Sequence, residues 1–243
     1  VYNFISEDEI RHELWIVNDD KDISLIEFEF NAVPDLYVAD GHHRTAAAAR
    51  VGQKKKDDNP HHNGTEEYNF FMAVLFSDDQ LKIYDYNRVV QDLNGKSPID
   101  FISELEKTFY ITKLHEASPP NEKGIFSMYL ENQWYSLKPK DRNFTENPKA
   151  DLDVIFLSEK ILSPILGIED LRKDTRIDFV GGIRGLNELE RRVDSKEMKV
   201  AFALFPVSMD ELISIADAGE IMPPKTTWFE PKLRSGLFIH ELE

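Results

Sequence analysis

The chain has 243 residues, of which 41% are hydrophobic and 11% aromatic, so it can form one large or two small folded domains. Its 29 basic and 45 acidic residues give a net charge of −16, which disfavours nucleic acid as a partner and favours a soluble, cytoplasmic protein. The absence of cysteine excludes disulfides, thiolate-bound metals and cysteine nucleophiles, and no apolar run predicts a membrane span.

The first part of the chain, residues 1–95, starts at Val1 rather than at a methionine, so we expect an N-terminal portion to be missing. The sequence predicts a strand, a segment that fits either helix or strand, a second strand, a helix, a mobile loop and a β-hairpin, over residues 13–17, 22–33, 36–39, 43–50, 53–67 and 68–90. Gly52 is expected to lie just after the end of the helix.

The second part, residues 96–243, alternates strands and helices. Ser97 and Pro98 predict the start of an amphipathic helix. Strands are expected over residues 110–114, 125–130, 133–138, 176–180, 199–205 and 237–242, and helices over residues 97–109, 151–167, 186–193 and 208–219. Hairpins mixed with crossover helices favour an α+β fold with a mixed sheet, and the two parts are also compatible with a single domain.

A compact polar motif stands where a predicted strand meets a predicted helix: Asp40, Gly41, His42, His43 and Arg44. Free N–H groups at a helix start attract anions, and the histidine and arginine side chains add donors and charge. Asp40 would cap the helix, or act on a substrate proton or a metal ion. The structural alternative is a helix cap beside two surface histidines. Adjacent histidines point in different directions, which argues against a metal site made from this pair alone.

A glycine-rich turn, residues 179–185, is the second candidate. Gly182 would allow a phosphate to approach the backbone, and Arg184 would supply a charged arm, although a plain tight turn is the alternative. Asp178, near the end of the preceding strand, could hold a metal ion. Arg88, at the end of another predicted strand, is either a further member of the site or a surface cation.

The third candidate is the proline-containing loop of residues 222–236. Its two prolines stiffen the backbone, and its basic and hydroxyl groups suit phosphate or carboxylate binding. Those groups are Lys225, Thr226, Thr227, Lys232 and Arg234. The alternative is a loop that packs through its aromatic residues Trp228 and Phe229.

The motifs "ADGHHR" and "MPPKTTWFEPK" resemble the bacterial and archaeal domain-of-unknown-function family 1015, over about residues 11–242. Members of this family usually carry a further stretch upstream of the first strand seen here. The Asp-Gly-His-His-Arg corner also resembles the ParB/sulfiredoxin-like fold, which includes free-serine kinases. This second resemblance implies a phosphate-binding corner with Asp40 near a metal or the phosphoryl acceptor. It does not imply sulfiredoxin activity, which needs a cysteine.

These observations predict an enzyme that binds a nucleotide or another small anionic ligand and transfers a phosphoryl group to a small hydroxylated metabolite. Asp40 would be the general base or a Mg²⁺ ligand, ATP or ADP the donor, and His42, His43 and Arg44 the phosphate contacts. The groups of the glycine-rich turn and the proline-containing loop would complete this site if the tail folds back onto the corner. Two alternatives stay open: a non-catalytic nucleotide or metabolite sensor, and a metal-dependent phosphoesterase. The sequence does not define the oligomeric state.

Overall fold

The computed structural model describes residues 1–7, 9–145 and 147–242, and the chain divides into two units, Val1–Val38 and Ala39–Glu243. The first unit contains an antiparallel hairpin of β1 (Tyr2–Ile5) and β2 (Arg11–Leu14), followed by α1 (Asp20–Asn31). The ambiguous segment is therefore helical, and the Asp19 side chain caps it by accepting a hydrogen bond from the Lys21 N–H. None of the described helices is long and apolar enough to cross a membrane.

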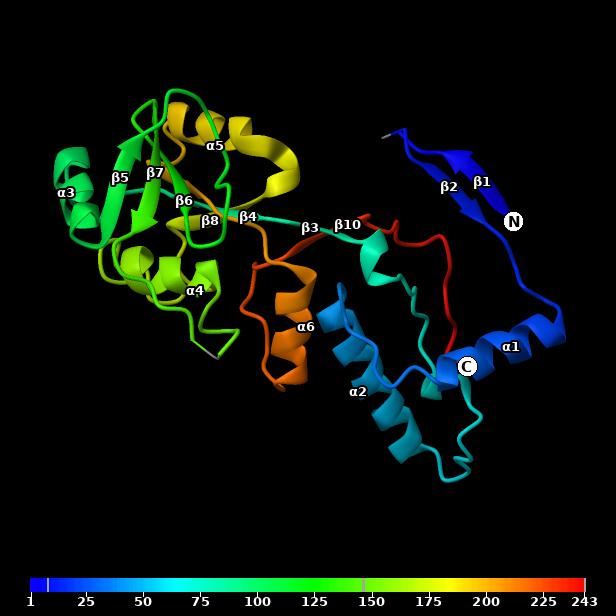
Figure 1. The fold of residues 1–243 in the computed structure, drawn as a ribbon. Coiled ribbons are helices and arrows are strands. Elements are labelled where there is room, and N and C mark those ends of the chain that lie inside the picture. Colours follow the sequence, from blue (N-terminus) through cyan, green and yellow to red (C-terminus); the bar gives the residue numbers. More distant parts are fainter. Residues whose placement is uncertain (8, 146, 243) are drawn as a thin grey trace. The chain divides into compact units, whose positions relative to one another are not determined.

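The second unit is built on a six-stranded sheet with the strand order β5-β7-β6-β9-β4-β8 (Figure 1). Its strands are β4 (Tyr86–Val90), β5 (Phe109–Lys113), β6 (Phe126–Leu130), β7 (Gln133–Pro139), β8 (Ile177–Gly181) and β9 (Val200–Ala203). The α+β class is confirmed. Neighbouring strands of this sheet pair antiparallel throughout, rather than in both directions as the term mixed sheet implied.

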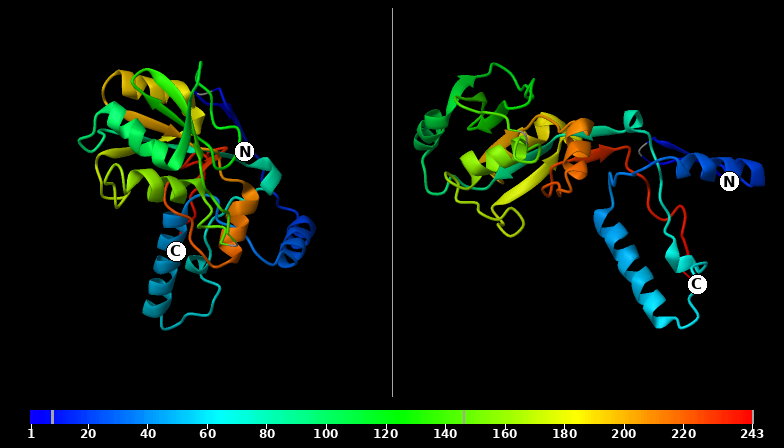
Figure 2. Two further views of the ribbon diagram at one scale, coloured as in Figure 1. Left: turned by 60° about the vertical axis from the view of Figure 1, so that its left-hand side comes forward. Right: turned by 60° about the horizontal axis from the view of Figure 1, so that its bottom comes forward.

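Helices cover both faces of this sheet (Figures 1 and 2). One face packs against α3 (Pro98–Thr108), α4 (Asp153–Leu157), the π-helical turn Ser158–Leu162 and α6 (Met209–Asp217). The other face packs against α5 (Gly185–Asp194). Alternation along each strand produces the two cores: Val90 and Phe202 face the first, Val89 and Ala201 the second. Each large apolar side chain that is fully buried stabilises the fold by about 1.5–3 kcal/mol.

Local signals set several element boundaries as predicted. The Ser97 hydroxyl accepts a hydrogen bond from the Asp100 N–H and starts α3. Ser208 and Glu211 form a reciprocal capping box that starts α6. Glu131 and Asn132, with φ of 48° and 62°, form the turn between β6 and β7.

The helix after the polar corner is longer than predicted. Helix α2 (His42–Asp58) continues through Gly52, and the loop that was expected to start at residue 53 starts after residue 58. A Cβ added to Gly52 would lie 2.7 Å from the carbonyl oxygen of Tyr68, so this glycine allows close approach of the 3₁₀ turn Glu67–Asn69 rather than ending the helix. Within the loop, the Glu66 carboxylate accepts hydrogen bonds from the N–H groups of Asn63 and Gly64.

Three predicted strand assignments were wrong. Residues 70–77 form no strand, so the hairpin predicted over residues 68–90 is absent; β3 (Lys82–Tyr84) instead pairs antiparallel with β10 (Trp228–Glu230). Residues 36–39 and 237–242 also lack strand pairing. Strand periodicity shows which segments can extend, but it does not show which distant segment supplies the hydrogen-bonding partner.

Candidate functional site

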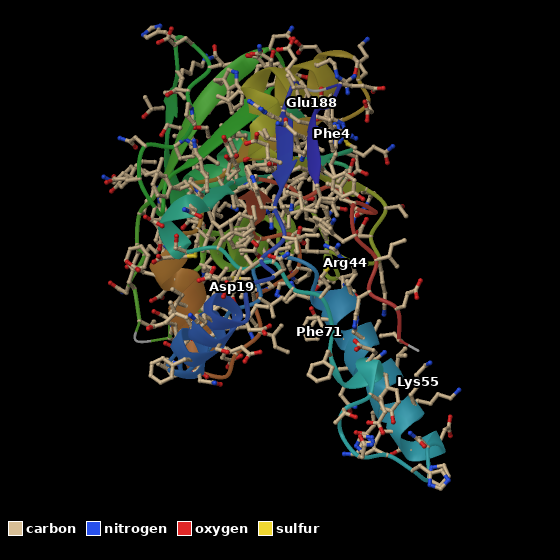
Figure 3. All side chains as sticks on the ribbon, turned by 90° about the vertical axis from the view of Figure 1, so that its right-hand side faces the viewer. Phe4, Asp19, Arg44, Lys55, Phe71 and Glu188 are labelled. Atoms are coloured by element: carbon tan, nitrogen blue, oxygen red, sulfur yellow. The ribbon has the colours of Figure 1, made fainter. Side chains whose placement is uncertain are left out.

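The polar corner forms the N-terminus of α2. Gly41 adopts a left-handed conformation with φ of 89°, which favours glycine, and the helix starts at His42 (Figure 3, where Arg44 marks the first turn). No side chain caps this end, and the first turn contains no acidic residue. The first N–H groups of a helix have no intrahelical acceptor. The corner therefore presents backbone donors and a partial positive charge.

The Asp40 carboxylate is held between two donors at this corner. One oxygen accepts a hydrogen bond from the Gly41 N–H at 2.7 Å, and the other accepts one from Nζ of Lys232 at 2.9 Å. The Arg44 guanidinium lies against Gly41, where an added Cβ would be 3.3 Å from Nη2. Partial burial opposes ionisation, but Lys232, the Gly41 N–H and Arg44 together hold the pKa of Asp40 below its ordinary value. Asp40 is therefore ionised at neutral pH.

His42 and His43 extend from the first turn of α2 and are exposed. Within the described part of the chain, neither imidazole forms a hydrogen bond or an ion pair. Among the described residues, no group of three or more histidine, aspartate or glutamate side chains is arranged to hold a metal ion. The two imidazoles are thus available for a ligand that contacts the helix start.

The proline-containing loop connects the corner to the end of the sheet. Nζ of Lys232, which pairs with Asp40, lies 5.4 Å from the centre of the Trp228 ring. That ring packs edge-on against Tyr86 at 5.7 Å and covers Gly181, where an added Cβ would lie only 2.5 Å from the ring. A continuous series of contacts therefore runs from Asp40 through the tail to strands β4 and β8.

Lys225 and Thr226 of this loop have partners outside the corner. Lys225 has φ of 56°, and its Nζ lies 5.5 Å from the centre of the Tyr86 ring. Thr226 is buried, and its hydroxyl donates to the carbonyl of Pro223 at 2.7 Å. The Thr227 hydroxyl has no partner within the described ranges. Lys232 is thus a predicted loop residue that contacts the corner directly.

The glycine-rich turn is closely packed by other side chains. The Gly182 N–H donates to the Asp85 carbonyl at 2.8 Å, and an added Cβ would lie 2.0 Å from a carboxylate oxygen of Asp85. Burial raises the pKa of Asp85. Arg184 is exposed and lies within electrostatic range of Glu188. In the part of the chain that the structure describes, no hydrogen bond or ion pair joins it to the corner.

Two further predicted residues have other surroundings. The Asp178 carboxylate pairs with Arg192 of α5 at 2.6 Å and therefore belongs to the α5 side of the sheet. Arg88 is fully buried on the opposite face, so it is not a surface cation. Asp85 and Tyr86 were not among the predicted site residues, although their position directly before Asn87 and Arg88, in a predicted strand that ends in two valines, was a usable signal.

The chain is similar to a solved free serine kinase in complex with AMP (17% identity, 88% of this chain and 81% of that chain covered, TM-score 0.39) and to a mutant of it in complex with ADP (19%, 79% and 66%, TM-score 0.36). It is also similar to a conserved hypothetical protein from Pyrococcus furiosus (16%, 79% and 68%, TM-score 0.39). At such scores these likenesses support no functional argument, and no curated protein matches the sequence.

A family model described as "Protein of unknown function (DUF1015)" matches residues 1–155, which include the Asp-Gly-His-His-Arg corner but not the proline-containing loop. The match covers more than half of the chain and confirms the resemblance seen in the sequence. The protein therefore belongs to the DUF1015 family.

Proposed function

We propose that the corner at the start of α2 binds the phosphates of ATP or ADP and that the protein transfers a phosphoryl group to a small hydroxylated metabolite. The observation that carries this proposal is the contact between Asp40 and Lys232, which brings a cation of the distant tail to an uncapped helix start that already holds Arg44. The corner thereby combines backbone donors, two cations and one carboxylate.

The charge distribution at the helix starts supports anion binding. Helices α1, α3 and α6 are capped by the side chains of Asp19, Ser97 and Ser208, and α4 and α5 have Asp153 and Glu188 in their first turns. Among the described α-helices, α2 alone has neither a side-chain cap nor an acidic residue in its first turn. A phosphate at this position would accept hydrogen bonds from the free N–H groups and interact favourably with the helix dipole.

The roles in the transfer follow from the chemistry of the side chains. The acceptor hydroxyl oxygen forms a bond to the terminal phosphorus, and the bond between that phosphorus and the bridging oxygen breaks. The nucleotide then leaves with the bridging oxygen and with one phosphate group fewer. Asp40 takes the hydroxyl proton, and Arg44, Lys232 and the two histidines hold the charged oxygens. Such a reaction depends mainly on positioning and charge neutralisation, and the corner supplies both.

Asp40 also fits Mg²⁺ as one ligand, because this ion is commonly held by one or two carboxylates together with substrate phosphates. When bound, the ion would neutralise phosphate charge. One Asp40 oxygen accepts from the Gly41 N–H and the other from Lys232, and each oxygen keeps a second lone pair with which it would contact an ion or an acceptor hydroxyl.

The test is to incubate the protein with ATP or ADP, Mg²⁺ and a pool of hydroxylated metabolites, and to measure nucleotide consumption. We expect consumption that requires an acceptor and disappears in Asp40→Asn but persists in Asp35→Asn, which removes an exposed charge five residues earlier. Tight nucleotide binding without turnover would replace the transferase with a sensor. Phosphate released from a diester without an acceptor would replace it with a phosphoesterase.

A further inference from the structure

Arg88 is a fully buried cation with unused hydrogen-bonding capacity. It lies on β4, and its neighbours in register on the adjacent strands are Phe179 and Phe202. Nη1 donates to the carbonyl of Tyr86, whereas Nε and Nη2 are buried without any partner. Within the described ranges, no carboxylate forms an ion pair with it.

This arrangement is unfavourable for the protein alone. Burial lowers the pKa of Arg88 only to about 9, so the guanidinium keeps its charge at neutral pH. A buried charge without a partner is strongly destabilising, and buried unpaired donors add to that penalty. The Phe179 ring, whose centre is 5.3 Å from the guanidinium carbon, offers a cation–π contact but no hydrogen-bond acceptor for Nε or Nη2.

The two unpartnered nitrogens define the shape of a missing partner. The N–H bonds of Nε and Nη2 point the same way along one edge of the planar guanidinium, which is the edge that pairs with both oxygens of a carboxylate or phosphate. Because Nη1 is already used by the Tyr86 carbonyl, this edge is oriented by the strand itself.

The residues around Arg88 indicate a route by which a ligand could reach the guanidinium. Met222 packs against the same core as Phe179, and Lys225 and Trp228 both contact Tyr86. The proline-containing loop therefore covers the end of the sheet that carries Arg88. Its movement would expose the guanidinium, and the exposed Lys225 ammonium would be a second cation at the entrance.

We infer that Arg88 is the buried receptor for an oxyanion, a carboxylate or a phosphate of a small-molecule ligand, which enters beneath residues 222–227. The inference goes beyond the transfer reaction proposed for the corner, because it stands on different residues and requires no turnover.

The test is thermal unfolding of the protein in inorganic phosphate and in acetate, each at constant ionic strength with chloride as the reference. We expect at least one oxyanion to raise the Tm. The anion that raises it, phosphate or acetate, identifies the chemical group that Arg88 binds. The same titration in Arg44→Ala distinguishes this site from the corner, since the response should persist there.

Variants of Arg88 decide between a binding and a structural role. Without oxyanion, Arg88→Met should unfold at a temperature at least about 2 °C higher than the unchanged protein, and it should lose the response. Arg88→Lys keeps the charge but not the paired edge, and should weaken oxyanion binding about tenfold or more. Arg191→Met, at an exposed arginine paired with Glu188, should keep the response.

Three results would overturn the inference. The first is a Tm that responds to neither oxyanion in the unchanged protein. The second is an equal response in Arg88→Met, which would place the anion elsewhere. The third is a lower Tm of Arg88→Met in chloride together with unchanged oxyanion affinity of Arg88→Lys, which would show that the guanidinium is a structural element.

Discussion

Replacing Gly181 by alanine tests whether the tail loop is seated on the end of β8. The backbone at Gly181 has φ of −63° and ψ of 135°, which any residue adopts, so the change adds no backbone strain. The new Cβ would lie 2.5, 2.8 and 2.9 Å from three atoms of the Trp228 ring. Carbon atoms in contact are normally about 3.5–4.0 Å apart. The ring or the strand must therefore move.

The expected effect follows from two opposing contributions. Overpacking a close contact costs about 1–3 kcal/mol, whereas a glycine-to-alanine change gains about 0.4–1 kcal/mol by restricting the unfolded chain. Because the contact involves three atoms of a rigid ring, we expect Gly181→Ala to lower the free energy of unfolding by about 2 kcal/mol. In a Trp228→Ala background the clash is absent, so the same change should stabilise the protein by up to about 1 kcal/mol.

The assay is urea unfolding of the four proteins of this double-mutant cycle, followed by far-UV circular dichroism with linear extrapolation to water. We predict that the effect of Gly181→Ala on the free energy of unfolding changes sign between the two backgrounds. An equal effect in both backgrounds would refute it, because the ring would then not occupy the space above Gly181.

Other predictions concern the loop and the helices. Partial burial of Glu66 opposes ionisation of its carboxyl group, but hydrogen bonds from loop amides hold its pKa at about 2, below the ordinary 4.5. Because the pKa of Glu66 is lower in the folded state, ionised Glu66 stabilises the loop above pH 4.5, and this stabilisation is lost as the pH falls towards 2. Hydrogen exchange of the Gly64 amide, corrected for its intrinsic pH dependence, should therefore accelerate between pH 4.5 and 2. An exchange rate that does not change over this range would contradict the prediction. Ser208→Ala should cost about 1 kcal/mol in urea unfolding, and Ser214→Ala on the same helix should cost much less; equal costs would argue against the capping box. Gly52→Ala, which would stabilise an ordinary helix, should instead release the segment after the loop and increase proteolysis there.

Features that depend on neighbouring residues could be predicted from the sequence. Ser97 before Pro98, and Ser208 three residues before Glu211, each supply a side-chain acceptor for a specific backbone N–H, so the starts of α3 and α6 are fixed locally. The strands of residues 125–138 are also recoverable, because a turn separates two runs of apolar residues.

Features that depend on distant residues could not be predicted. The partner of β3 is β10, at the other end of the second unit, and nothing within either segment specifies that pairing. Gly52 has the sequence signature of a helix end, but its role is set by the backbone of Tyr68, which reaches it only in the folded chain.

The candidate site divides in the same way. The residues of the corner could be selected from their types and spacing, but the contact of Lys232 with Asp40 forms only in the tertiary structure. The burial of Arg88 is another, since the same arginine at a strand end would be equally acceptable in solvent. Trp228 lies between Lys232 and the end of the sheet, but in the sequence its residue type indicated only that the loop could pack through it.

The most direct test of phosphate binding at the corner is an NMR titration of the backbone amides with ATP and Mg²⁺. We predict that the amides of His42, His43 and Arg44 shift in a saturable manner, because they are the free donors at the start of α2, while the capped first turn of α6 stays unchanged. Saturable shifts that leave these three amides unchanged would contradict the proposed site, as would no shift at all.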